Sequence, residues 1–193
     1  MIRHCPVGRR PMPRHITRLS VAFLLAFSVI FALAAGASAK PSPYRMASLA
    51  RGVNVTSWFR FPAAWDDAHF TGYLRDSDLS NLKQAGFTYI RLPVDPAVMG
   101  DASGHLYSWR VRQLETAIKR INAAGLAVMI QPHPPTSQSF DQAPMQQVIR
   151  NFWTELAPAM AKLPADKVFL EIMSEPIFSG RERDWAVLQQ ELA

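Results

Sequence analysis

The chain has 193 residues, and its formal net charge of +6 and pI of about 9.9 would suit a protein that binds nucleic acid or a membrane surface. The charge is concentrated at one end, because residues 1–39 carry five arginines and no acidic residue, which leaves a formal charge of +1 for residues 40–193. The composition therefore argues against a nucleic-acid partner.

Residues 1–39 have the layout of a secretory signal peptide. A basic segment precedes an apolar run from Leu19 to about Ala35, and small residues at 37–39 form a cleavage site before Lys40. We expect export to the periplasm or the medium, with no membrane attachment after cleavage. The alternative is an uncleaved anchor, since a run of about seventeen residues is at the short end of what spans a bilayer.

The only cysteine of the chain, Cys5, lies inside the expected signal peptide. The exported protein can form no internal disulfide, so its stability must come from packing. Residues 40–50 are expected to be a lead-in segment, and residues 51–193 are enough for one domain of ordinary size.

Residues 51–193 alternate short apolar strands with amphipathic helices. We expect strands at residues 51–55, 87–93, 126–131 and 168–173, and helices at residues 76–85, 109–124, 144–162 and 184–192. Gly86 would be the left-handed residue that ends the first helix, and Gly125 would stop the second. This order predicts an α/β fold of parallel strands with right-handed crossovers.

An aromatic loop follows the first expected strand. Trp58, Phe59 and Trp65 in this loop would suit stacking on sugar rings, because the flat face of an aromatic ring matches a pyranose ring. The alternative is that they pack beneath the loop.

A polar residue stands at the end of three of the expected strands: Arg91, His133 and Glu175, each 42 positions from the next. In a parallel α/β sheet these ends share one rim, which is where ligands bind. An arginine there can orient carboxylates or hydroxyls, and a glutamate can donate or accept protons. The alternatives are a structural ion pair for Arg91, a loop position for His133, and a surface or helix-capping role for Glu175.

Four segments in order, RGVN at 51–54, IRLP at 90–93, VMI at 128–130 leading to His133, and FLEIMSEP at 169–176, resemble the first four strands of glycoside hydrolase family 5. The resemblance implies a (β/α)8 TIM barrel, of which about the first four βα units are present. It also implies a retaining, cellulase-like hydrolase of β-linked polysaccharides that needs no metal and no other cofactor.

By this resemblance, Arg91 would contact the nucleophile, His133 would lie near the sugar in the −1 subsite, and Glu175 would be the general acid and base. Ser174 stands where the family has an asparagine that binds the sugar 2-hydroxyl. That contact would be lost or bridged by water, and we expect the rate to suffer more than binding. Trp58 would be a further substrate contact.

The resemblance places the nucleophilic glutamate on a seventh strand, whereas four strands are expected here. Glu171 shares a face with Glu175 by strand alternation, but four residues at about 3.3 Å each place it roughly 13 Å away. Asp95 and Asp101 follow the second strand, and nothing in the sequence positions them.

We therefore expect a truncated form with little or no hydrolysis, for which a C-terminal half-barrel is the missing partner. One alternative is a non-catalytic exported carbohydrate-binding protein on a four-unit α/β fold. Another is a membrane-anchored α/β protein of unrelated function.

Overall fold

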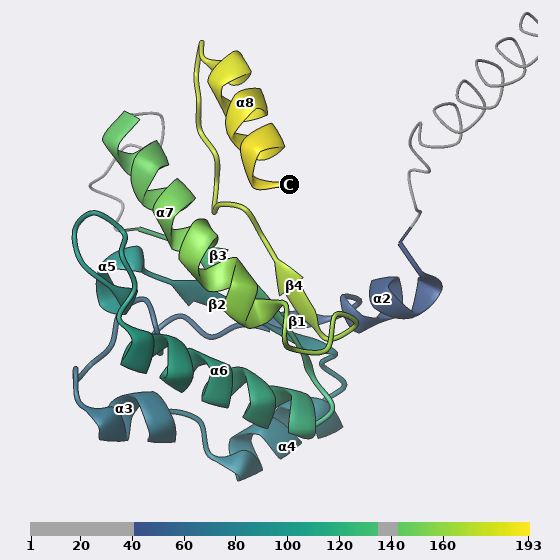
Figure 1. The fold of residues 1–193 in the computed structure, drawn as a ribbon. Coiled ribbons are helices and arrows are strands. Elements are labelled where there is room, and N and C mark those ends of the chain that lie inside the picture. The colour runs from purple at the N-terminus through teal and green to yellow at the C-terminus, as the bar shows by residue number, and fades with distance from the viewer. Residues whose placement is uncertain (1–40, 135–142) are drawn as a thin grey trace, which may run out of the picture. The chain divides into compact units, whose positions relative to one another are not determined.

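The computed structural model describes residues 41–134 and 143–193, and in these ranges a parallel sheet is flanked by helices (Figure 1). The expected signal peptide lies outside the described residues. Within those two ranges, no helix combines the length and the apolar character needed to cross a membrane.

The sheet consists of β1 (Gly52–Asn54), β2 (Tyr89–Val94), β3 (Ala127–Pro132) and β4 (Val168–Leu170), hydrogen-bonded in that order and all parallel. The register sets Asn54 beside Arg91, Arg91 beside Met129, and Met129 beside Phe169. The predicted α/β fold with parallel strands is confirmed, and the carboxyl ends of the strands lie along one edge.

The helices are α2 (Pro43–Ser48), α3 (Asp67–Gly72), α4 (Asp76–Gln84), α5 (Pro96–Met99), α6 (Ser108–Ala123), α7 (Ala143–Met160) and α8 (Glu182–Leu192). The four expected helices correspond to α4, α6, α7 and α8. Gly86 has a φ of 86°, as predicted for a left-handed stop, and Gly125, the predicted stop of the next helix, is left-handed too with a φ of 80°.

The short helices α2, α3 and α5 were not expected from the sequence. Each has six residues or fewer and begins at a side-chain cap, where Ser42, Asp66 or Asp95 accepts a backbone N–H of the first turn. Helices of this length have too few apolar positions to show a period of 3.6 residues, so the pattern did not reveal them.

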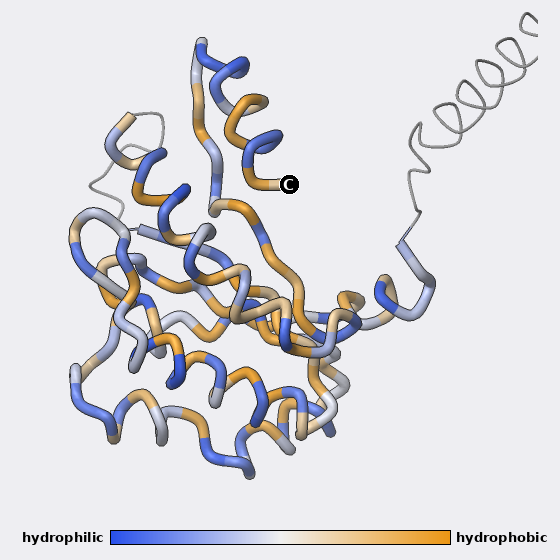
Figure 2. Tube along the Cα trace, viewed as in Figure 1, coloured by the Kyte–Doolittle hydropathy of each residue, from blue (hydrophilic) through white to orange (hydrophobic). Residues whose placement is uncertain are grey.

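The hydrophobic core lies between one face of the sheet and helices α6 and α7. Buried side chains alternate along the central strands, at Ile90 and Leu92 of β2 and at Val128 and Ile130 of β3. They belong to one apolar cluster with the helix residues Leu114, Ile118, Ile121, Ile149, Phe152 and Leu156. Figure 2 shows the result, with largely hydrophobic strands and helices that alternate between hydrophobic and hydrophilic positions.

Strand β4 is shorter than the predicted strand at 168–173. Beyond Leu170, the N–H of Glu171 donates to Ile130 O at 2.9 Å, and the N–H of Ser174 donates to Pro132 O at 3.3 Å. Between these two hydrogen bonds the chain moves on by three residues after β4 but by only two residues in β3. This segment therefore carries one extra residue, as in a β-bulge. The strand alternation that we expected from Glu171 to Glu175 is broken at this point.

Candidate functional site

The carboxyl ends of β2, β3 and β4 bring the predicted polar residues to one rim. Arg91 lies in β2, His133 directly follows β3, and Ser174 and Glu175 follow β4. The N–H of His133 donates to Val94 O at 2.7 Å, which ties the end of β3 to the end of β2. His133 and Glu175 thus follow their strands as expected, whereas Arg91 is the third residue of β2 and lies three residues before its end.

The surroundings of His133 lower the pKa of its imidazole. Burial is the largest cause, and the positive charge of Arg60 adds to it, whereas the negative charge of Glu175 opposes it. Arg91 and Glu171 act on the same pKa with smaller and opposite effects. The charges of Arg60, Glu175, Arg91 and Glu171 therefore all lie within electrostatic range of the His133 imidazole.

Arg91 forms a two-point ion pair with Glu171. Its Nε donates to Oε2 at 2.8 Å and its Nη2 to Oε1 at 2.5 Å. This hydrogen bonding raises the pKa of Arg91. In the described residues Arg91 thus shows the structural ion pair that was the alternative, and the sequence did not identify Glu171 as its partner. The available signal was an acid inside an otherwise apolar strand.

Arg60, in the loop after β1, is a rim residue that the sequence analysis missed. Its guanidinium lies over the ring of Phe61, with Cζ 4.4 Å from the ring centroid. Burial lowers the pKa of Arg60, while the nearby charges of Asp95 and Glu175 raise it. A single cation in an aromatic loop gives little indication of its direction, so only the tertiary structure placed it near Glu175.

The two other carboxylates considered from the sequence have local roles. Asp95 is buried and accepts the N–H of Ala97 at 2.9 Å as the cap of α5, and burial raises its pKa. Asp101 accepts the N–H of Ser103 at 2.8 Å and its hydroxyl at 2.6 Å within one turn. In the ranges 41–134 and 143–193, no three His, Cys, Asp or Glu side chains gather in a way that could hold a metal ion.

Glu175 has an unusual backbone conformation. Its φ of 45° makes it the only non-glycine residue with a positive φ in the part of the chain that the structure describes. Such strain gathers at functional sites, where the surrounding structure enforces it. The side chain is exposed at the rim, and its role as acid and base stays a prediction.

Ser174 is only 1% exposed, and its hydroxyl has no hydrogen-bond partner among the described residues. In this conformation the hydroxyl is covered, which agrees with the expectation that Ser174 makes no direct contact with the sugar 2-hydroxyl.

The prediction that Trp58 contacts substrate is wrong. Trp58 is 0% exposed, its indole N–H donates to Phe70 O at 2.9 Å, and its ring packs against Phe59 and Tyr73. Phe59 is equally buried, so both residues belong to the core. Trp65, at 61% exposure, is the member of the predicted group that remains available for stacking.

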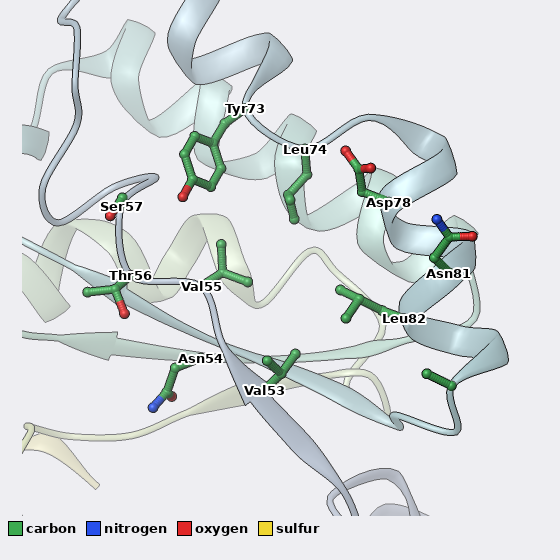
Figure 3. A pocket seen from close by; sticks show the side chains of 11 residues that line it. Val53, Asn54, Val55, Thr56, Ser57, Tyr73, Leu74, Asp78, Asn81 and Leu82 are labelled. Atoms are coloured by element: carbon green, nitrogen blue, oxygen red, sulfur yellow. The ribbon is translucent and has the colours of Figure 1, made fainter.

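A groove of about 670 Å³ lies away from the rim, between β1 and α4 (Figure 3). Val53, Val55 and Leu82 line it, while the side chain of Asn54 points to the other side of the strand. The carboxylate of Asp78 at its border already pairs with Arg75 at 2.9 Å. The groove offers apolar packing surface at the open edge of the sheet, and Thr56, Ser57, Tyr73 and Asn81 add polar side chains to its lining.

We expect Arg60→Gln to raise the pKa of His133, because it removes a positive charge that disfavours the imidazolium. In the folded wild type that pKa lies below its usual value of about 6.5. Between these two pKa values the unfolded chain binds the proton more readily than the folded protein, so lowering the pH through this range destabilises the fold. Arg60→Gln should bring the folded-state pKa of His133 closer to 6.5 and so narrow this pH range. NMR titration of the His133 imidazole measures the shift, with Arg60→Lys as the charge-preserving control. Identical pKa values in wild type and Arg60→Gln would contradict the electrostatic role of Arg60.

Comparison with known proteins adds to this geometry. A family model described as Cellulase (glycosyl hydrolase family 5) matches residues 49–193. A curated relative, "Probable glucan 1,3-beta-glucosidase A" of Aspergillus niger, is 28% identical over 79 residues, which are 39% of this chain and 19% of the relative.

Solved structures share the fold at low sequence identity. Endoglucanase Cel5A of Thermotoga maritima, in complex with cellobiose, has a TM-score of 0.63 and 21% identity and covers 78% of this chain and 49% of its own. A hyperthermophilic endo-β-1,4-glucanase in complex with substrate has a TM-score of 0.61 and 20% identity, over 77% of this chain and 48% of its own. The chain thus spans about half the length of these structures, and its sheet matches part of their TIM barrel.

Proposed function

The chain belongs to glycosyl hydrolase family 5, and from this premise we propose that it acts in the retaining hydrolysis of β-linked glucans, with Glu175 as general acid and base. The observation that carries the proposal is the rim itself. An exposed carboxylate in a strained conformation stands beside a half-buried imidazole and two arginines, at the sheet edge where such barrels bind ligands.

Glu175 would protonate the leaving oxygen and then activate water for the second step. Its charge lies within range of Arg60 and His133, and these groups would orient the sugar and the carboxylate. Trp65 would supply an exposed aromatic face for a neighbouring sugar unit. The names of structural neighbours, endoglucanases solved with cellobiose or mannotriose, support a β-linked oligosaccharide as ligand.

Retention requires a second carboxylate about 5–5.5 Å from the first. Among the described residues, Glu171 is bound to Arg91, Asp95 caps α5, and Asp101 is held in its own turn. We propose that the nucleophile comes from strands outside residues 51–193, in a complementary half-barrel, and that residues 41–193 alone hydrolyse weakly or not at all.

Export is the remaining part of the proposal, and it rests on the signal-like segment at residues 1–39. N-terminal sequencing of the protein recovered from outside the cytoplasm should find Lys40 first. A product that still begins near Met1 and stays in the membrane fraction would point to an anchor.

The function is tested by measuring binding and hydrolysis of β-1,4- and β-1,3-glucan oligosaccharides by the purified protein. We expect residues 41–193 to bind these oligosaccharides on their own. When strands that carry the nucleophile complete the site, we expect release of reducing ends and a first product with the β-anomeric configuration in proton NMR. An α-anomer as first product would contradict retention, and absence of both binding and hydrolysis would contradict the function. Binding with no hydrolysis, even when the complementary strands are supplied, would instead favour a non-catalytic carbohydrate-binding protein.

A further inference from the structure

Buried polar side-chain atoms that lack a hydrogen-bond partner are concentrated beneath the rim. In the ranges 41–134 and 143–193 such atoms occur on six residues, and four of these residues belong to the rim: Arg60, Gln131, His133 and Ser174. Gln131 is the most complete case, since it is 0% exposed and neither its amide nitrogen nor its amide oxygen has a partner.

The strands make three of these residues neighbours: Gln131, His133 and Ser174. Gln131 and His133 are two positions apart at the end of β3, so they lie on the same face, about 7 Å from each other. The hydrogen bond from Ser174 N to Pro132 O sets Ser174 beside His133 on the neighbouring strand. Beside Gln131 itself the register places Pro93, which has no side-chain donor or acceptor, and on the other side Glu171, whose carboxylate is bound to Arg91.

Buried amides and hydroxyls are nearly always hydrogen-bonded, and where protein partners are lacking a water with two to four polar neighbours takes their place. Two hydrogen bonds of about 2.8 Å through one oxygen span the distances between neighbouring side chains on one face. The Gln131 amide, the His133 Nδ1 and the Ser174 hydroxyl supply the three partners that such a water needs.

We propose that Gln131, His133 and Ser174 hold one buried water molecule beneath the rim, and that this water keeps His133 in a single neutral tautomer. Gln131 is then a positioning residue that acts through His133. Its consequence for sugar binding rests on the proposed function, whereas the water and the tautomer do not.

The tautomer is measured by ¹⁵N NMR of the His133 imidazole in the purified protein without ligand, with the signals assigned by their loss in His133→Asn. We expect one tautomer in the wild type and an exchanging mixture in both Gln131→Met and Ser174→Ala, which remove polar groups at similar volume. The matched control is Asn122→Leu, because Asn122 also has a buried unpartnered oxygen but precedes the opposite end of β3. A tautomer mixture in the wild type, or a single tautomer that neither variant changes, would overturn the proposal.

The midpoint temperature of thermal unfolding gives a second readout, because the direction of its change in Gln131→Met tells a bonded amide from an unbonded one. If the Gln131 amide had no partner at all, its replacement by methionine would raise the midpoint temperature, because an unsatisfied buried group would be removed. Since we propose that it is bonded through water, we expect the midpoint to fall, and a rise would contradict the water site.

Cellobiose affinity then links the inference to function. Gln131→Met should weaken binding by about threefold to tenfold, the equivalent of one hydrogen bond. If the wild type binds no oligosaccharide, the proposed function fails while the ligand-free NMR and unfolding results still decide on the water site. Unchanged affinity together with a changed tautomer would remove the positioning role of Gln131.

Discussion

Replacing Glu175 with glutamine should lower the rate of β-glucan hydrolysis by about 100-fold to 10,000-fold, the usual contribution of a general acid and base. Glutamine keeps the shape of the side chain but cannot protonate the leaving oxygen. The initial rate of reducing-end release measures the effect, in any preparation with measurable hydrolysis. Oligosaccharide affinity should change little, because the substitution leaves the rim contacts in place.

Two comparisons make the Glu175 experiment specific. Hydrolysis of an aryl β-glucoside with a good leaving group should fall much less, because such a group departs without protonation. Glu115→Gln is the matched control, since Glu115 lies on α6 and pairs with Lys119 at 3.8 Å. Equal rates in the two glutamine variants would remove Glu175 from the mechanism.

Trp58→Ala should lower the free energy of unfolding by about 3–5 kcal/mol, as for other large aromatic side chains removed from a core. The substitution leaves a cavity beside Phe59 and Tyr73 and leaves Phe70 O without its indole donor. Urea unfolding followed by circular dichroism measures the loss.

Trp65→Ala is the control for Trp58. Trp65 is 61% exposed, so its removal should change the free energy of unfolding by no more than about 0.5 kcal/mol. We expect it to weaken oligosaccharide binding instead. Should Trp58→Ala keep its stability and lose sugar binding, the original assignment of Trp58 to the substrate would have been right.

The regular elements were readable from the sequence because their signals are local. The apolar stripe of α6 and the stops at Gly86 and Gly125 depend on residues close together in the chain, and all of them appear as expected. The short helices α2, α3 and α5 and the early end of β4 were not readable, because hydrogen bonds at caps and at the bulge determine them.

The candidate site divides in the same way. The placement of Arg91, His133 and Glu175 on one rim follows from strand order alone, since the carboxyl ends of parallel strands must share an edge. The partners of these residues do not follow from it. The ion pair between Arg91 and Glu171 joins side chains eighty positions apart, and Arg60 reaches the rim from an irregular loop.

By itself, the sequence determined the α/β alternation and the parallel arrangement of the strands, and it placed Arg91, His133 and Glu175 at or near strand ends. Periodicity and strand ends carry that information within short stretches of chain. Only the tertiary structure decided that Trp58 is core, that Ser174 is covered and that Glu175 adopts a left-handed conformation. Burial and strain arise when distant segments of the chain come together. Here these are β3 with the bulged segment after β4, and the aromatic loop with the core. No local sequence pattern records such contacts.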